Sequence, residues 1–231
     1  MLFDDRIDAA KRLAERLKEW LHKDIMIQRE HTNYINTVIV LAIPRGGVVV
    51  GDVIASILGV KLDVIVTRKI GAPDNPELAI GAVMPDGSYS LNKDIVRMLN
   101  IPRSYITEQA SIQKKEIQRR LAAFKGEDSD HYKNFEGKIV IIVDDGIATG
   151  ATILSAAHWL RTKQNCCKML IIAVPVAPPD VIDKINELSD KAIVLYTPAL
   201  FGSVGRFYRN FEQVSDAEVR EIMIRHGHKP M

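Results

Sequence analysis

Two adjacent carboxylates, Asp144 and Asp145, follow a run of four apolar residues at positions 140–143. The apolar run is typical of a buried strand, and the small and hydroxyl-bearing residues at 146–152 are typical of a loop that leads into a helix. Ligands of open α/β sheets bind beyond the carboxyl ends of the strands, where two acids can accept hydrogen bonds from vicinal hydroxyls. A helix N-terminus beside them offers N–H groups to a phosphate. The pattern predicts a sugar-phosphate site with both acids exposed; the alternative is that the acids cap the helix.

A second loop of this kind follows the apolar residues 38–43, which predict another buried strand. It reads Pro44-Arg45-Gly46-Gly47 and precedes an apolar segment at 48–58, so the three parts form one βα unit. Its loop would expose Arg45 and bare backbone amides at the same sheet edge as Asp144. Taken alone, the loop is equally well explained as a simple turn in which the glycines serve geometry.

A third predicted strand, at residues 62–67, places Arg68 and Lys69 directly at its end. Two neighbouring cations in this position are usually solvated charges, but here they would share an edge with Arg45 and the two acids. The segment that follows, residues 71–76, is rich in glycine and proline and is expected to be a mobile loop.

Aromatic residues gather near the end of the chain, where Phe201, Phe207 and Tyr208 lie close to Gly202 and Gly205. Such a cluster can stack on a flat ligand, and its position after the last βα unit makes it the candidate for binding an acceptor molecule. The alternative is a small satellite core without a ligand.

These loops need an α/β scaffold, which the apolar periodicity supplies. We expect a single domain over residues 1–231, with a central, mainly parallel sheet flanked by helices, a small hairpin and helical insert at about 71–136, and a C-terminal hood at about 197–231. The hairpin is predicted from residues 78–84 and 88–91. The predicted helices cover residues 4–22, 93–100, 103–124, 180–189 and 216–226, and one more helix follows the acids to about 163; further strands are predicted at 169–176 and 192–196.

Composition argues against several other classes. The net charge of +2 gives no general reason to bind nucleic acid, and the basic helix at 103–124 has alternating acids and no interleaved aromatics. Cys166 and Cys167 are adjacent and match no metal site, so we interpret them as reduced thiols in a cytoplasmic protein. No apolar run is long enough to span a membrane. The loop at 146–152 lacks the lysine of a nucleotide P-loop, and no dinucleotide motif follows a strand.

Four hydrophobic residues, two acids and Thr149-Gly150-Ala151-Thr152 closely resemble the 5-phosphoribosyl-1-pyrophosphate (PRPP) motif of type I phosphoribosyltransferases. The resemblance extends to the Pro-Arg-Gly-Gly loop, residues 75–83 and residues 201–219. In these segments the chain resembles predicted phosphoribosyltransferases of unassigned acceptor. The resemblance implies a PRPP site made by Arg45, Gly46, Gly47, Asp144, Asp145, Gly146, Ile147, Ala148, Thr149, Gly150, Ala151 and Thr152. Ala148 stands where the hypoxanthine-guanine enzymes usually have an acid that is thought to serve as general base, which argues against a 6-oxopurine acceptor.

The implied reaction is attack of a nitrogen nucleophile on C1 of PRPP with loss of pyrophosphate, which places the protein in nucleotide metabolism. Asp144, Asp145, Arg68 and Lys69 are the expected catalytic residues. Mg²⁺ is the expected cofactor, bound through PRPP rather than by a dedicated protein site. Phe201, Phe207 and Tyr208 are the expected acceptor contacts. A PRPP-binding regulator without turnover is the alternative, and a homodimer is left open as the assembly.

Overall fold

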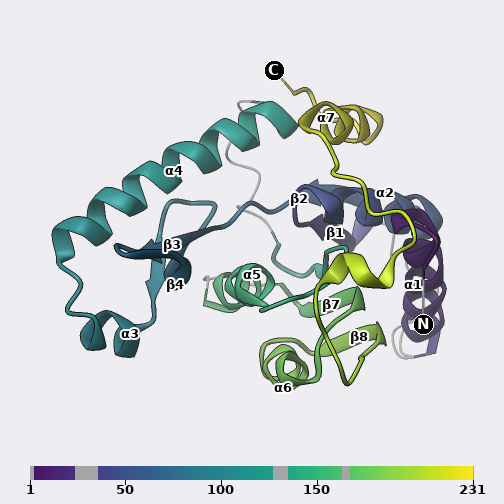
Figure 1. The fold of residues 1–231 in the computed structure, drawn as a ribbon. Coiled ribbons are helices and arrows are strands. Elements are labelled where there is room, and N and C mark those ends of the chain that lie inside the picture. The colour runs from purple at the N-terminus through teal and green to yellow at the C-terminus, as the bar shows by residue number, and fades with distance from the viewer. Residues whose placement is uncertain (1–2, 24–35, 127–134, 163–166, 231) are drawn as a thin grey trace.

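The computed structural model describes residues 3–23, 36–126, 135–162 and 167–230, and its centre is a five-stranded parallel sheet of order β2-β1-β6-β7-β8 (Figure 1). The strands are β1 (Val38–Ala42), β2 (Lys61–Val64), β6 (Ile139–Val143), β7 (Met169–Val176) and β8 (Lys191–Tyr196). Every residue of β1 and β6 is buried, as expected for inner strands covered on both faces. These findings confirm the predicted α/β class.

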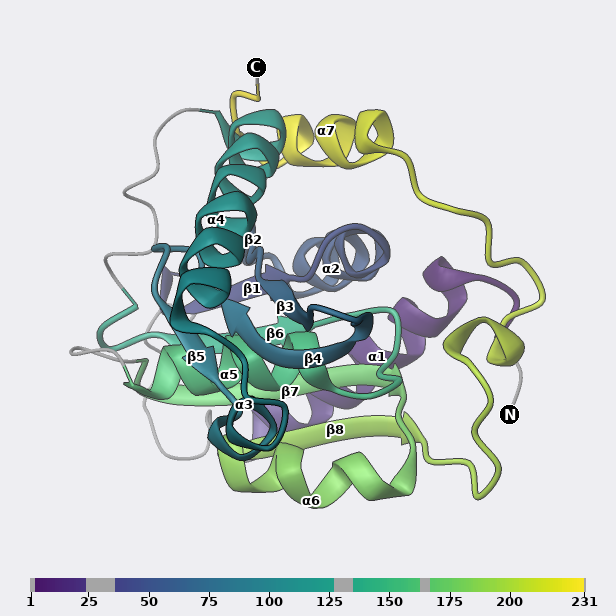
Figure 2. The same cartoon turned by 60° about the vertical axis from the view of Figure 1, so that its left-hand side comes forward.

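Helices cover both faces of this sheet (Figures 1 and 2). On one face α1 (Arg6–Leu21) packs against α2 (Gly46–Leu58), and on the other α5 (Ala151–Thr162) packs against α6 (Pro179–Leu188). Local signals set the boundaries: the Asp5 side chain accepts a hydrogen bond from the Asp8 N–H at the start of α1, and Gly59 ends α2 in a left-handed conformation at φ 67°. The predicted end of α5 at Lys163 lies outside the described residues.

The sheet has a topological switch between the neighbouring strands β1 and β6. From β1 the chain crosses through α2 to β2 on one side, whereas from β6 it crosses through α5 to β7 on the other side. At such a point the loops that leave the two central strands diverge and leave a crevice for a ligand. The loops after β1 and β6 therefore occupy the favoured binding position of this architecture.

The insert forms a second, antiparallel sheet of β3 (Arg68–Ala72), β4 (Asn75–Val83) and β5 (Tyr89–Leu91), followed by α3 (Lys93–Met98) and α4 (Arg103–Lys125). The predicted hairpin is present, but two predictions are wrong. The strand expected at 62–67 ends at Val64, where its pairing with β1 ends, and residues 71–76 form a tight strand connection instead of a mobile loop. A Cβ on Gly71 would lie 2.5 Å from the carbonyl oxygen of Pro76, so this glycine permits close strand contact.

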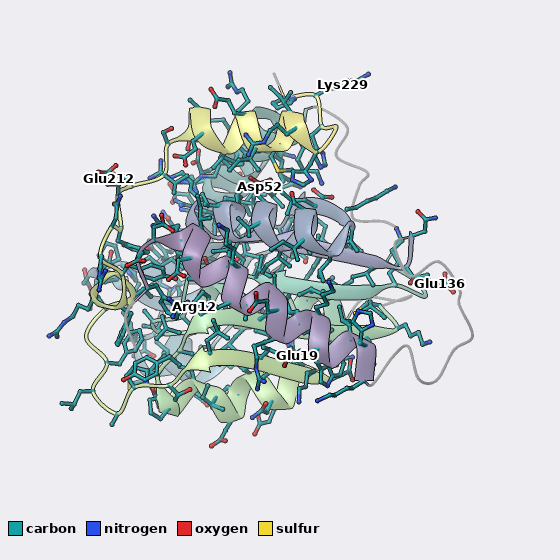
Figure 3. All side chains as sticks on the ribbon, turned by 90° about the vertical axis from the view of Figure 1, so that its right-hand side faces the viewer. Arg12, Glu19, Asp52, Glu136, Glu212 and Lys229 are labelled. Carbon is teal, nitrogen blue, oxygen red and sulfur yellow. The ribbon has the colours of Figure 1, made fainter. Side chains whose placement is uncertain are left out.

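The C-terminal segment runs from β8 through the 3₁₀ turn η4 (Val204–Phe207), pairs at Tyr208 with Phe3 just before α1, and continues to α7 (Asp216–Arg225) (Figure 2). Helix α7 packs against both α2 and α4, so it bridges the central layer and the insert. Figure 3 shows Asp52 of α2 beneath α7, where its carboxylate contacts Arg225 at 2.6 Å and His226 at 2.7 Å. The end of the chain is thereby fixed to α2 and, through the contact of His228 with the Leu62 carbonyl at 2.9 Å, to β2.

Candidate active site

The loops after β1 and β6 lie in direct contact. Ala42 and Val143 are paired at the ends of the two strands, and the N–H of Ile43 donates to the carbonyl of Val143 at 3.0 Å. The peptide bond between Pro44 and Arg45 is cis. A Cβ on Gly46 would lie 1.8 Å from Oδ2 of Asp145, and one on Gly47 would lie 2.9 Å from Cα of Asp144. The two glycines are therefore required for the approach, and the structure joins both predicted loops into one site.

The two acids are only partly exposed, which corrects the expectation that both stand free on a loop. Asp144 accepts a hydrogen bond from the Asp145 N–H at 2.8 Å, and Asp145 pairs with Nε of Arg6 at 2.8 Å. Burial raises the pKa of Asp144 well above its ordinary value, and the neighbouring charge of Asp145 raises it further. Burial also raises the pKa of Asp145, while the bond from Arg6 opposes that rise. The bonds of both carboxylates thus serve the loop and α1, not the cap of α5.

The acid loop, residues 144–150 between β6 and α5, lines an open pocket of about 200 Å³. The lining residues are Asp144, Gly146, Ile147, Ala148, Thr149, Gly150, Ala151, Thr152, Ile153 and Val204. Gly150 has a left-handed φ of 77° directly before α5 begins, so the chain turns there and directs the first turn of the helix at the pocket. The N–H of Ile147 donates to the carbonyl of Val176 and anchors the loop to β7, so this amide serves the loop rather than a ligand.

The structure separates the predicted cations. Arg45 belongs to the loop that contacts the acids, and its side chain pairs with Asp216 of α7 at 3.3 Å. Lys69 pairs with Glu77 at 2.8 Å and lines a neighbouring pocket of about 370 Å³ that shares Ala151 and Thr152 with the acid-loop pocket. Lys69 is therefore close to the site.

Arg68 points elsewhere, toward α4, where its Nε donates to Gln113 at 3.0 Å. Burial lowers the pKa of Arg68, and the nearby charge of Arg120 lowers it further. Successive residues of a strand point to opposite faces, so Arg68 and Lys69 cannot both face the pocket. Arg68 and Lys69 therefore face different parts of the structure, and their joint catalytic role stays a prediction.

The C-terminal aromatics divide into two groups. Phe201 and Phe207 are partly exposed and have ring centroids 5.4 Å apart, so they stay candidates for acceptor contacts. Tyr208 is 5% exposed, packs on Phe3 and Phe211, and donates its hydroxyl hydrogen bond to the carbonyl of Asp145. This buried position corrects its predicted acceptor role. Tyr208 instead holds the acid loop in place through its hydrogen bond to the Asp145 carbonyl.

Sequence reasoning missed Arg6, whose side chain reaches the site from the first turn of α1. In the sequence it is one of several charged residues between the apolar positions of a helix, and no local signal distinguishes it.

Comparison with known proteins agrees with this geometry. A family model described as "Phosphoribosyl transferase domain" matches residues 5–194. Two Mycobacterium tuberculosis proteins, named "Putative phosphoribosyl transferase MT0597" and "Putative phosphoribosyl transferase Rv0571c", are each 41% identical over 219 residues, which is 94% of this chain and 45% of theirs. This chain thus spans about half the length of those relatives.

Among solved structures, the protein TT1426 from Thermus thermophilus superposes with a TM-score of 0.73 at 33% identity, covering 97% of this chain and 99% of that chain. The chain belongs to the phosphoribosyl transferase domain family. None of the helices within the described residues has the length and apolar character that crossing a membrane requires.

Proposed function

We propose that this protein transfers the 5-phosphoribosyl group of PRPP to a nitrogen nucleophile, a nucleobase or related amine, and releases pyrophosphate as a pentosyltransferase. The contact between the Gly46-Gly47 turn and the acid pair carries this proposal. This contact places the loop of Arg45 and two glycines beside two carboxylates and beside a pocket at the start of α5. The glycines leave their backbone amides open to a ligand. Those parts match the three parts of PRPP: a pyrophosphate, a ribose with vicinal hydroxyls, and a 5-phosphate.

Each part has a distinct task. Asp144 and Asp145 accept hydrogen bonds from the ribose hydroxyls, and the amides and hydroxyls of Thr149, Gly150 and Thr152 bind the 5-phosphate. Arg45 and the amides of Gly46 and Gly47 bind the pyrophosphate. In the reaction the nitrogen lone pair forms a bond to C1 while the C1–oxygen bond breaks, and the electron pair leaves with the pyrophosphate. Preorganised donors stabilise that growing charge, and one such contact commonly contributes about a hundredfold in rate.

Mg²⁺ is the proposed cofactor, and it would be bound through PRPP. Among the described residues no group of three or more His, Cys, Asp and Glu side chains could hold a metal ion. Mg²⁺ usually keeps several waters and binds enzymes largely through substrate phosphates, and the pyrophosphate of PRPP offers oxygens of that kind. When bound, the ion would neutralise part of the negative charge on the departing pyrophosphate. Phe201 and Phe207 are the proposed contacts of the acceptor, because a planar base stacks on aromatic rings.

The test is pyrophosphate release by the chain with Mg²⁺ and PRPP and a panel of purines, pyrimidines and amines. Thr152→Val removes a hydroxyl that lines the acid-loop pocket, so PRPP affinity should fall by roughly ten- to hundredfold, the usual worth of a hydrogen bond to a charged group. Thr162→Val is the matched control, because its hydroxyl bonds the Trp159 carbonyl at the other end of the same helix.

Calorimetry measures PRPP affinity independently of turnover. Absence of PRPP binding to the folded chain would overturn the proposal. Binding without pyrophosphate release for every acceptor would overturn transfer and favour a PRPP-binding regulator.

A further inference from the structure

Arg6 joins both ends of the chain to the acid pair. Its Nε donates to Oδ2 of Asp145 at 2.8 Å, and its Nη1 donates to the carbonyl of Glu212 at 2.8 Å. The guanidinium also lies over the ring of Phe211, 3.8 Å from the ring centroid. The side chains of Arg6 and Asp145 are 11% and 14% exposed. One side chain of α1 thus bonds the centre of the site and the C-terminal segment together.

The surroundings of Asp145 show why this bond matters. Asp144 faces it with a like charge from the same loop, and Tyr208 donates to its carbonyl rather than to its carboxylate. Arg45, the cation of the neighbouring loop, contacts Asp216 of α7. Within the described part of the chain, Arg6 is the cation that the structure bonds to the Asp145 carboxylate. A carboxylate in such a place needs a charged donor to stay ionised against desolvation.

Arg6 also lies against the Gly46-Gly47 turn after β1. A Cβ on Gly46 would come within 3.0 Å of Nε of Arg6, and within 1.8 Å of Oδ2 of Asp145. Arg6, Asp145 and Gly46 therefore meet at one point, where a shift of any of them moves the other two. The contacts to Glu212 and Phe211 hold the guanidinium in a fixed plane, so the direction of the bond to Asp145 is fixed as well.

We propose that Arg6 is a positioning residue for phosphoribosyl transfer, which holds Asp145 as an oriented carboxylate toward the ribose and makes that orientation depend on the docking of the C-terminal segment. This inference rests on the proposed function, because it assumes that Asp145 receives ribose hydroxyls. A purely structural role, in which Arg6 only holds the C-terminal segment against α1, would also explain the contacts to Glu212 and Phe211. It would not make the pH dependence of PRPP binding sensitive to Arg6.

Arg6→Gln and Arg6→Lys separate the two roles, with Arg12→Gln as the matched control. Arg12, labelled in Figure 3, is a second arginine of α1; it bonds Asp8 at 2.8 Å and lies 5.6 Å from the ring centroid of Phe3. PRPP affinity is measured by calorimetry in Mg²⁺ at a series of pH values, from the ordinary carboxyl range upward into the alkaline range. Thermal unfolding identifies any variant that is not folded.

Arg6→Gln should weaken PRPP binding at neutral pH by roughly tenfold or more, since a charged hydrogen bond to the ribose-binding acid is lost. Binding needs ionised Asp145, so affinity falls as pH falls through the pKa of that group. Without Arg6 that pKa rises, and the loss should begin at higher pH. Arg6→Lys keeps the charge, so it should retain the pH profile of the wild type but only part of its PRPP affinity. Arg12→Gln should behave as wild type.

Carbon-13 titration of the Asp145 carboxyl in the unliganded protein gives a readout without PRPP, and its pKa should rise in Arg6→Gln only. If the wild type binds PRPP, but folded Arg6→Gln binds with the same affinity and pH profile, the inference fails and the proposed function stands. If the wild type binds no PRPP, both fail. If Arg6→Gln does not fold, an Arg6→Lys variant with an unchanged carboxyl pKa and an affinity below wild type supports the inference, and wild-type affinity refutes it.

Discussion

Replacing the two acids one at a time should change stability in opposite directions. Asp144→Asn removes one of two neighbouring negative charges in a partly buried place, while its side-chain oxygen can still accept the bond from the Asp145 N–H, which is 2.8 Å long in the wild type. Asp145→Asn instead breaks the ion pair with Arg6, whose side chain is 11% exposed. The first change relieves repulsion, and the second leaves a largely buried cation without its carboxylate.

The sizes follow from these contacts. Relief of a destabilising feature at a functional site commonly adds about 0.5–2 kcal/mol. At about 2–4 °C per kcal/mol for a chain of this size, Asp144→Asn should raise Tm by roughly 1–8 °C. Loss of a hydrogen bond to a charged group costs about 1.5–3 kcal/mol. Asp145→Asn should therefore lower Tm by roughly 3–12 °C.

Dependence on pH gives a second check. Burial and the charge of Asp145 raise the pKa of Asp144, so the folded chain keeps a proton at a pH where the unfolded chain has lost it. The free energy of unfolding of the wild type therefore falls as pH rises from the ordinary carboxyl value, about 4, toward the raised folded value. Asn does not titrate, so the advantage of Asp144→Asn should be near zero in acid and should grow toward neutral pH.

The assay is thermal unfolding at a series of pH values, combined with PRPP calorimetry on the same preparations. Both variants should bind PRPP more weakly, which separates a stability gain from a functional gain. The reasoning is refuted if folded Asp144→Asn is destabilised above pH 7 as much as Asp145→Asn is, or if its stability relative to wild type does not change with pH.

Two further substitutions and one comparison of acceptors test other parts of the structure and of the proposed function. Lys125 pairs with Asp63 at 2.7 Å with side chains 3% and 10% exposed, so Lys125→Met should cost about 3–5 kcal/mol in the free energy of unfolding and leave PRPP affinity at low temperature unchanged. Gly46→Ala would place a Cβ 1.8 Å from Oδ2 of Asp145, so calorimetry should show weakened PRPP binding in a chain that still folds. With Ala148 in the loop, guanine and hypoxanthine should support pyrophosphate release about a hundredfold or more slowly than the preferred acceptor, and robust guanine-dependent release would contradict that.

Much of the fold is predictable because its signals are local. Residues 38–43 and 140–143 are continuously apolar, a pattern that is typical of a strand covered on both faces. The acids and glycines then follow at the carboxyl ends of those strands, and parallel packing must bring such ends to one edge. The contact of Gly46 with Asp145 is thus a consequence of two local patterns and one topological rule.

The remaining errors have physical causes. The apolar residues Ile65 and Val66 follow Val64 in sequence, but pairing with β1 ends at Val64, and sequence alone does not show where a neighbouring strand stops. Arg68 then starts a new strand whose alternation directs it to α4. Arg6 is 139 positions from Asp145, so their bond depends on how α1 docks rather than on any motif. The supporting role of Tyr208 escapes prediction for the same reason, because Phe3 covers it from the other end of the chain.

The missing side chains of Gly46 and Gly47 have a thermodynamic consequence. Because Gly46 lies against the Asp145 side chain and Gly47 against the Asp144 backbone, where Cβ atoms would keep the loops apart, a ligand that shifts one loop must shift the other. Occupancy of the pyrophosphate loop and occupancy of the ribose acids then become linked quantities, and the linkage is reciprocal: the factor by which pyrophosphate changes the affinity for a ribose 5-phosphate equals the factor for the reverse order of addition. Measured in both orders, that factor reports how rigidly two loops from opposite sides of the switch act as one.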